Sequence, residues 1–206
     1  MSATLYSFRR CPYAMRARLA LDVSGVEVNL REIRLRDKPQ AFLDASPSAT
    51  VPCLVSEAVT IDESLDIMKW ALGQHDPEGW LDMPVLGNDL IARFDGPFKS
   101  ALDRTKYATR YPDEDPDQHR TIASAFLTDL NTQLHGWVFG KPTLADYAIL
   151  PFVRQFAFID KDWFDAQDWP HVQAWLEAFL ASDRFTRIMV KYPPWQPGDA
   201  PVRFPG

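Results

Sequence analysis

The stretch from Thr4 to Ile33, TLYSFRRCPYAMRARLALDVSGVEVNLREI, decides the fold of this chain. A short apolar run ending at Phe8 predicts a strand, and the apolar spacing after it predicts a helix that runs to Ser24 and stops at Gly25. Residues 26–33 predict a second strand. Two strands joined through a helix pair in parallel, so the chain opens with a βαβ unit.

The segments that follow extend this unit into a small domain. Its further predicted elements are a helix over 39–45, two strands over 51–55 and 59–61 that form a hairpin, and a helix over 63–72. The next stretch loses this periodicity and gains prolines and glycines, which is typical of a linker. We therefore expect a domain over residues 1–75, with a four-stranded mixed sheet and helices on its faces, and a linker over 76–87.

Beyond the linker, apolar residues recur at helical spacing, which predicts an all-helical domain over residues 88–206. Gly96-Pro97 should interrupt its first helix. Thr143 and Asp146 have the spacing of a capping box, which starts another helix. The tail from Pro193 to Gly206 contains five prolines and is expected to be extended. This tail folds over the active site, packs elsewhere or frays.

Composition limits the possible functions. The chain has 206 residues, of which 46% are hydrophobic, and a net charge of −6, which argues against nucleic-acid binding. Residues 1–38 nevertheless hold eight Lys and Arg against four Asp and Glu. The excess positive charge of that region either belongs to a solvated surface or creates an electrostatic field that attracts a small anionic substrate. The chain has two cysteines, too few for a disulfide framework, and they show no metal-ligand spacing, so we expect a cytoplasmic protein without a metal. The sequence has no long apolar stretch, so we expect no membrane contact.

Cys11 is the candidate nucleophile. It stands between the first strand and the first helix, where unpaired N–H groups and the helix dipole favour an anion. Pro12 suits the first helical turn, and Arg9 and Arg10 add positive potential. The alternative is a buried, inert cysteine. We expect a reactive thiol that titrates below the free value of about 8.5.

Three further features point to a bound peptide. A cis peptide bond before Pro52 would expose the N–H and C=O of Val51 to an extended peptide. Glu63 and Ser64 open a helix, where the N-terminus and a hydroxyl bind a carboxylate and the Glu63 side chain pairs with an ammonium. Lys38 could neutralise a second carboxylate. Each feature is weak when taken singly.

Together these motifs resemble the glutathione transferase superfamily over essentially the whole chain. The motifs are, in order, Cys11-Pro12-Tyr13, Lys38, Val51-Pro52, Glu63-Ser64 and the capping box at Thr143. The Cys-Pro-Tyr start is similar to glutaredoxins and to omega-class and related bacterial cysteine-type transferases. The resemblance implies the glutathione transferase fold, with a thioredoxin-like first domain and a helical-bundle second domain, and it implies a homodimer.

The resemblance also implies glutathione as cosubstrate, with no metal, and a role for each matching residue. Cys11 would form a mixed disulfide with glutathione, and Pro52 would be the cis-proline. The remaining implied contacts are Val51 with the cysteinyl backbone, Glu63 and Ser64 with the γ-glutamyl end, Lys38 with the glycyl carboxylate, and Tyr13 with a substrate.

One departure selects a subtype. Dithiol glutaredoxins carry a second cysteine where this chain has Ala14, so we expect monothiol chemistry in which a second glutathione releases the mixed disulfide. Cys53 is either a resolving thiol or a buried small residue. Phe94, Phe98 and Tyr107 could line a site for the second substrate or belong to the core.

The hypothesis is therefore a glutathione-dependent thiol transferase. Its partners would be glutathione and a small-molecule or glutathionylated acceptor. A first alternative is a transferase that conjugates glutathione to apolar electrophiles. A second is a non-catalytic glutathione-binding protein that acts in a stress response.

Overall fold

A computed structural model describes residues 3–206, and these form two compact units. The first unit contains the residues up to Leu81 together with Ala181–Gly206, and the second is Asp82–Leu180. The sequence pattern predicted that Ala181–Gly206 belongs to the helical domain. In the structure it joins the first unit, because it supplies a helix and a strand that pack there.

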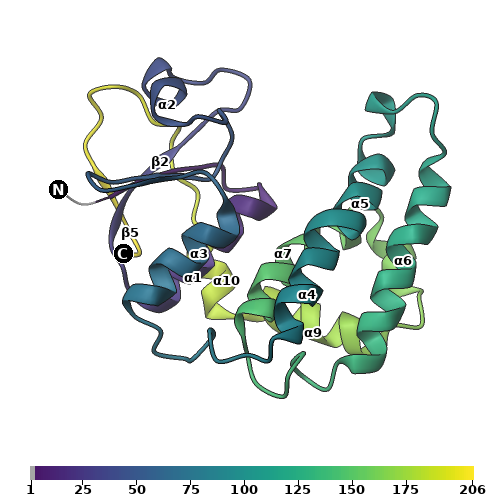
Figure 1. The fold of residues 1–206 in the computed structure, drawn as a ribbon. Helices are drawn as coiled ribbons and strands as arrows, with labels where there is room; N and C mark the ends of the chain where they lie inside the picture. Colours follow the sequence, from purple (N-terminus) through teal and green to yellow (C-terminus); the bar gives the residue numbers. More distant parts are fainter. Residues whose placement is uncertain (1–2) are drawn as a thin grey trace. The chain divides into compact units, whose positions relative to one another are not determined.

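The first unit is an α/β structure around one sheet (Figure 1). Its elements are β1 (Thr4–Ser7), α1 (Pro12–Ser24), β2 (Val28–Glu32), α2 (Gln40–Ala45), β3 (Cys53–Val55), β4 (Thr60–Ile61), α3 (Ser64–Gln74), α10 (Asp183–Ile188) and β5 (Val202–Phe204). The strand order is β4-β3-β1-β2-β5. Strands β1 and β2 pair in parallel and all other neighbours pair antiparallel, so the sheet is mixed as expected.

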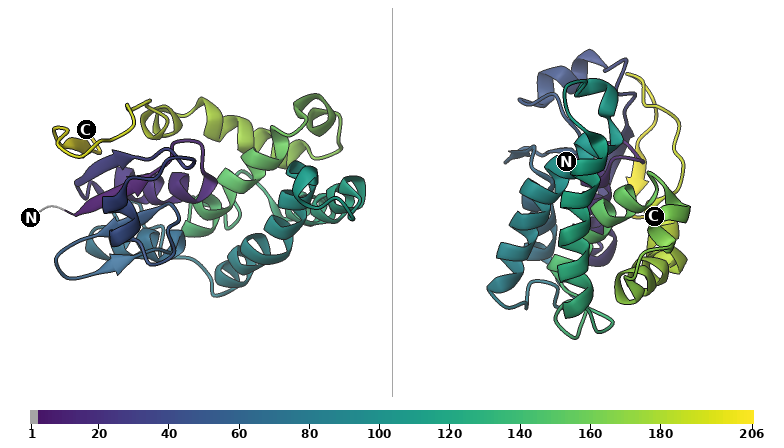
Figure 2. Two further views of the ribbon diagram at one scale, coloured as in Figure 1. Left: turned by 90° about the horizontal axis from the view of Figure 1, so that it is seen from above. Right: turned by 90° about the vertical axis from the view of Figure 1, so that its right-hand side faces the viewer.

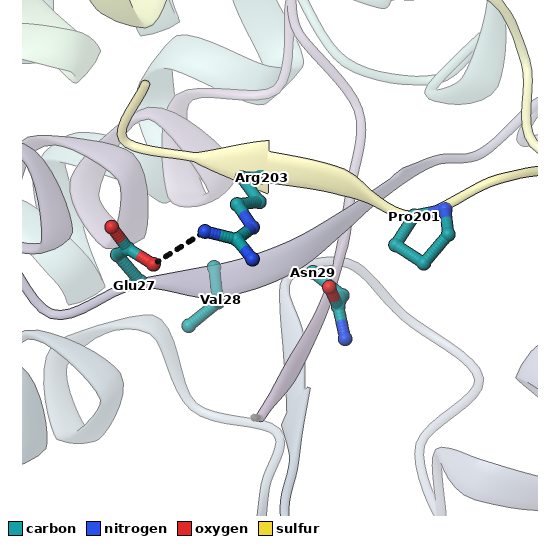
Figure 3. Close-up of a pocket in the computed structure, with 5 residues that line it drawn as sticks. All are labelled: Glu27, Val28, Asn29, Pro201 and Arg203. Atoms are coloured by element: carbon teal, nitrogen blue, oxygen red, sulfur yellow. Dashed lines mark ion pairs between the residues drawn. The ribbon is translucent and has the colours of Figure 1, made fainter. Parts of the chain in front are cut away.

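The prediction of four strands was wrong, because the C-terminal tail adds β5 beside β2. Phe204 pairs with Val28 in the register of the two strands and is almost fully buried. Without β5, the backbone groups of β2 would form an unpaired edge. Figure 2 shows the yellow C-terminal segment beside the sheet, and Figure 3 shows β5 along β2, with Arg203 paired to Glu27 at 3.8 Å.

Helices cover both faces of this sheet. In Figure 1, α1 and α3 lie on one face and α2 lies on the other. Helix α1 is buried along most of its length and packs against α3 and α10. It ends at Gly25, whose φ of 68° is a left-handed conformation that favours glycine. The buried helix α1 thus has a defined start and a defined end.

The proline-rich tail before β5 packs on the same sheet. The N–H of Trp195 donates to the carbonyl oxygen of Glu32 at 2.8 Å. Its ring lies 4.0 Å from the Arg31 guanidinium and contacts the Tyr6 ring edge to face. Cation–π contacts and a backbone hydrogen bond therefore hold the tail along β2.

Part of the segment expected to be a linker is packed into the first unit. The carboxylate of Asp76 accepts hydrogen bonds from the N–H groups of Trp80 at 2.9 Å and Leu81 at 2.8 Å. The Trp80 side chain is fully buried. These contacts explain why the first unit extends to Leu81.

The second unit is helical throughout. Its elements are α4 (Leu86–Arg93), the π-helical turn η1 (Phe94–Phe98), α5 (Lys99–Lys106), the 3₁₀ turn η2 (Ala108–Arg110), α6 (Pro116–Gln133), α7 (Leu144–Ala157), α8 (Lys161–Asp165) and α9 (Pro170–Ala181). The interruption expected at Gly96-Pro97 is the π-helical turn, since Pro97 cannot donate a backbone hydrogen bond. Helices α5 and α6 lie side by side (Figure 1).

Helix α7 forms the centre of the second unit, and nearly all of its residues are buried. The carboxylate of Asp146 accepts hydrogen bonds from the N–H of Thr143 at 2.9 Å and of Val138 at 3.0 Å. Burial raises the pKa of Asp146, although these hydrogen bonds work in the opposite direction. The capping residues predicted from the sequence therefore start the central helix.

Candidate active site

Cys11 stands at the N-terminus of α1, directly after the turn that follows β1. Its backbone is extended, with φ −74° and ψ 124°, and Pro12 takes the first helical position. The N–H of Cys11 donates to the carbonyl oxygen of Phe8 at 2.9 Å, which closes the turn. The side chain is half-buried. A partly accessible thiol therefore lies at the positive end of a helix.

Val51 lies beside this thiol. The Sγ atom of Cys11 is 3.7 Å from the Val51 carbonyl oxygen. The two residues meet because β1 pairs antiparallel with β3, where Tyr6 stands opposite Cys53. The Val51–Pro52 peptide bond is cis. The structure thus brings together Cys11 and the backbone that was predicted to bind an extended peptide.

A buried arginine that the sequence analysis did not single out supports the turn before Cys11. The Arg18 guanidinium donates to Ser7 Oγ and to the Arg9 carbonyl oxygen, each at 2.6 Å. Burial lowers the pKa of Arg18 to about 10, while the charges of Glu32 and Cys11 act to raise it. Arg18 is therefore a buried cation close enough to Cys11 for their charges to interact.

Glu32 is the acidic partner in this buried group. Its carboxylate accepts a hydrogen bond from the N–H of Arg9 at 2.6 Å and lies 4.0 Å from Arg18. Burial raises the pKa of Glu32, and the hydrogen bond and the Arg18 charge only partly offset this. The Arg9 side chain donates to the carbonyl oxygen of Met189 at 3.3 Å. Arg9 thus links the turn to the segment after α10.

Cys53 is a free thiol that is fully buried, unlike Cys11. Burial, together with the neighbouring carboxylate of Asp62, raises the pKa of Cys53 to about 12. A thiol with this pKa carries almost no thiolate near neutral pH. The structure therefore favours the reading of Cys53 as a buried small residue over that of a resolving thiol.

Asp62 is a second residue that sequence reasoning missed. Its carboxylate accepts hydrogen bonds from Ser46 Oγ at 3.0 Å and from the N–H of Ser48 at 2.8 Å. Burial acts to raise the pKa of Asp62, but hydrogen bonds from Cys53, Ser48 and Ser46 outweigh it and lower the pKa overall. Asp62 thereby connects the start of α3 to the loop before Val51. Its place directly before Glu63 is the only signal in the sequence.

Glu63 and Ser64 begin α3. Glu63 is exposed at the N-cap with an extended backbone, and among the described residues its side chain finds no capping hydrogen bond. Ser64 is the first helical residue and is buried. An exposed carboxylate and a helix N-terminus therefore lie next to each other, with Asp62 rather than Glu63 making the contacts within the fold.

Lys38 and Tyr13 make contacts of their own. Lys38 Nζ donates to the carbonyl oxygen of Ala49 at 2.9 Å, so Lys38 and Asp62 both hold the loop over residues 46–50. The ring of Tyr13 lies 5.8 Å from the Arg16 guanidinium, and its side chain is half-buried.

The aromatic residues considered for the second substrate differ in their surroundings. Phe94 and Phe98 are buried, with ring centroids 4.7 Å apart, and pack within the second unit. They belong to the core there. Tyr107 is half-buried, and the cations of Lys106 and Arg110 lie 5.2 and 4.4 Å from the centre of its ring.

Residues 3–206, the described part of the chain, contain neither a candidate metal site nor a candidate membrane-spanning helix. No group of His, Cys, Asp or Glu side chains there is arranged to hold a metal ion. None of its helices combines the length and the apolar character needed to cross a membrane.

Comparison with known proteins gives matches along most of the chain. Residues 5–79 match the model for the glutathione S-transferase N-terminal domain, and residues 89–178 match that for the C-terminal domain. A probable glutathione transferase of Aplysia californica is 31% identical over 85 residues, which are 41% of this chain and 87% of the relative. Glutathione S-transferase omega-1 of Sus scrofa is 40% identical over 50 residues, 24% of this chain and 21% of the relative.

A solved structure shows the same fold. It is a glutathione transferase family member from Pseudomonas fluorescens with two glutathione bound, and it superposes with a TM-score of 0.76 at 18% identity. The superposition covers 91% of this chain and 92% of that one. With both domain models and the Aplysia relative in agreement, this chain belongs to the glutathione S-transferase family.

Proposed function

We propose that this protein is a glutathione-dependent thiol transferase of the monothiol type, with Cys11 as the nucleophile. The observation that carries the proposal is the half-buried Cys11 thiol at the N-terminus of α1, 3.7 Å from the carbonyl oxygen of Val51. The positive charge of Arg18 favours the thiolate form, because the attraction between Arg18 and Cys11 is mutual. Similarity to the omega-1 transferase of Sus scrofa supports the cysteine type.

The reaction proceeds by two thiol–disulfide exchanges. The Cys11 thiolate attacks the glutathione sulfur of a mixed disulfide; the old S–S bond breaks and the second substrate leaves as a thiolate that takes a proton from water. A second glutathione thiolate then attacks the Cys11 disulfide and forms glutathione disulfide, which regenerates the Cys11 thiolate. Ala14 stands where a resolving cysteine would be, so this step needs the second glutathione.

Glutathione would lie along the loop before Val51. The Val51 backbone pairs with the cysteinyl residue, in the manner of an added strand. Glu63 accepts from the ammonium of the γ-glutamyl end, and Ser64 with the helix N-terminus binds its carboxylate. Lys38 reaches the glycyl carboxylate, and Tyr13 contacts the substrate beside the thiol.

The test is reduction of the mixed disulfide of glutathione and 2-mercaptoethanol, measured for the wild type, Cys11→Ala and Cys53→Ala. We expect activity in the wild type and in Cys53→Ala, and none in Cys11→Ala. Isothermal titration should show that Cys11→Ala still binds glutathione, because the charged contacts are separate from the sulfur. Equal activity in Cys11→Ala, or inactivity of the wild type, would overturn the proposal in favour of a conjugating enzyme or a binding protein.

A further inference from the structure

The first unit carries a pocket of about 510 Å³ whose lining includes none of the residues proposed to contact glutathione. Its lining residues come from two segments: Phe8 and Arg10 from the turn after β1, and Arg34, Leu35 and Arg36 from the loop after β2. The volume falls within the range of about 300–1,000 Å³ that is usual for small-molecule sites. The pocket is large enough for a compact organic molecule.

Two residues of this pocket, Phe8 and Arg10, lie on the turn that leads directly into Cys11. Arg10 directly precedes Cys11, and the Cys11 N–H is bonded to the Phe8 carbonyl oxygen at 2.9 Å. Phe8 and Cys11 pack against the same buried cluster, which is Tyr6, Ile33, Phe42, Val51 and Cys53. The N–H of Ile33 donates to the Ser7 carbonyl oxygen at 2.7 Å, so the loop that begins at Arg34 leaves the sheet beside the same turn.

The pocket combines three cations with two apolar side chains. The Arg10 guanidinium lies 5.4 Å from the centre of the Phe8 ring. Arg34 and Arg36 are exposed. Within residues 3–206, no carboxylate forms an ion pair with any of these three arginines. The nearby Glu32 is occupied by the Arg9 N–H and faces the buried Arg18. Three positive charges are therefore available to a ligand.

We propose that this pocket, defined by Phe8, Arg10, Arg34, Leu35 and Arg36, binds the second substrate and selects for a carboxylate on an apolar body. The proposal rests on the proposed function, because it names the substrate class of the same thiol. The carboxylate would accept charge-assisted hydrogen bonds from the guanidinium groups. Phe8 and Leu35 would contact the apolar body. The Cys11 thiolate attacks the glutathione sulfur of this substrate as in the proposed reaction, and the carboxylate is unchanged by the disulfide exchange.

The test compares two substrates that differ in one charge. These are the mixed disulfides of glutathione with 4-(mercaptomethyl)benzoate and with 4-(mercaptomethyl)benzamide, whose sulfur chemistry is nearly the same. The readout is the ratio of kcat/KM for the benzoate to kcat/KM for the benzamide. We expect this ratio to exceed one in the wild type and to fall by about tenfold in Arg34→Gln/Arg36→Gln, since two ionic hydrogen bonds are lost.

Arg203→Gln is the matched control. Arg203 is an exposed arginine of the same unit. It pairs with Glu27 near the start of β2 (Figure 3), whereas Arg34 and Arg36 follow the end of that strand. It should leave the ratio unchanged. Salt gives a second readout: raising the ionic strength should lower kcat/KM for the benzoate more than for the benzamide, because screening weakens exposed charge pairs.

The outcomes separate this inference from the proposed function. If the wild type reduces both substrates with a ratio near one, or if the double variant keeps the wild-type ratio, the pocket does not select for a carboxylate while the transferase assignment stands. If the double variant instead raises KM for glutathione and leaves the ratio unchanged, the arginines bind glutathione and the inference is overturned. Inactivity of the wild type toward both would refute the proposed function first.

Discussion

The Sγ atom of Cys11 lies 3.7 Å from the carbonyl oxygen of Val51, although 40 residues separate the two in the chain. Antiparallel pairing of β1 with β3 produces this contact. It places the proposed nucleophile beside backbone atoms that can bind a peptide.

The two cysteines should differ in reactivity. We expect iodoacetamide at pH 8 to modify Cys11 and to leave Cys53 unmodified, because burial raises the pKa of Cys53 to about 12. Peptide mapping by mass spectrometry measures this, and denatured protein should be modified at both sites. Cys11→Ala should take up no label in the native state. Modification of Cys53 at a rate similar to Cys11 would contradict the prediction.

Asp62→Asn should destabilise the protein by about 1 kcal/mol at pH 7, because ionised Asp62 accepts hydrogen bonds that a neutral amide accepts less well. The pKa of Asp62 is lowered in the folded state. The stabilisation is therefore present above the unfolded value of 3.8 and is lost as the pH falls below it. Urea unfolding at several pH values measures the difference, with exposed Asp113→Asn as control. If the difference in free energy of unfolding between the wild type and Asp62→Asn grew as the pH fell, the prediction would be wrong.

Glu63→Gln should raise KM for glutathione by about tenfold, since one ionic hydrogen bond to the ammonium is weakened. Because the exposed Glu63 side chain makes no capping bond within the described residues, the free energy of unfolding should change by less than about 0.5 kcal/mol. Steady-state kinetics and urea unfolding measure the two effects. Asp66→Asn, a change of an exposed carboxylate in the first turn of the same helix, should leave KM unaltered. A Glu63 variant with normal KM would remove this residue from the site.

Phe204→Ala should cost about 3 kcal/mol of stability, because this ring of β5 is almost fully buried. Its neighbour Arg203 points to solvent and makes one ion pair with Glu27, so Arg203→Ala should cost less than about 1 kcal/mol. Chemical unfolding of both variants tests the contribution of β5. Equal and small effects would mean that β5 contributes little to the first unit.

Much of the fold could be predicted from local patterns. The βαβ opening, Gly25 as the end of α1 and the capping of α7 by Asp146 depend on residues close together in the sequence. The fifth strand could not be predicted in this way. Val202–Phe204 is only three residues long, lies between prolines and finds its partner β2 far away in the chain.

The contacts that support the candidate site could not be predicted from the sequence either. Arg18 reads as an ordinary polar residue of a helix, yet it is buried and donates to Ser7 and Arg9. Asp62 reads as a residue before a helix start, yet it binds the loop containing Ser48. Both roles depend on segments that only the fold brings together. The excess of positive residues around Cys11 could be read from the sequence. The pocket that brings Arg10, Arg34 and Arg36 together could not.

Strand β5 also has a consequence for the order in which the protein is made. On the ribosome, β1 to β4 emerge early, whereas Val202–Phe204 emerges only after the whole helical unit has been synthesised. Until then the outer edge of β2 stays unpaired, and open strand edges readily pair with other chains. A nascent chain of this protein therefore passes through a period in which its first domain is nearly complete but prone to association. That period ends when Val202–Phe204 pairs with β2.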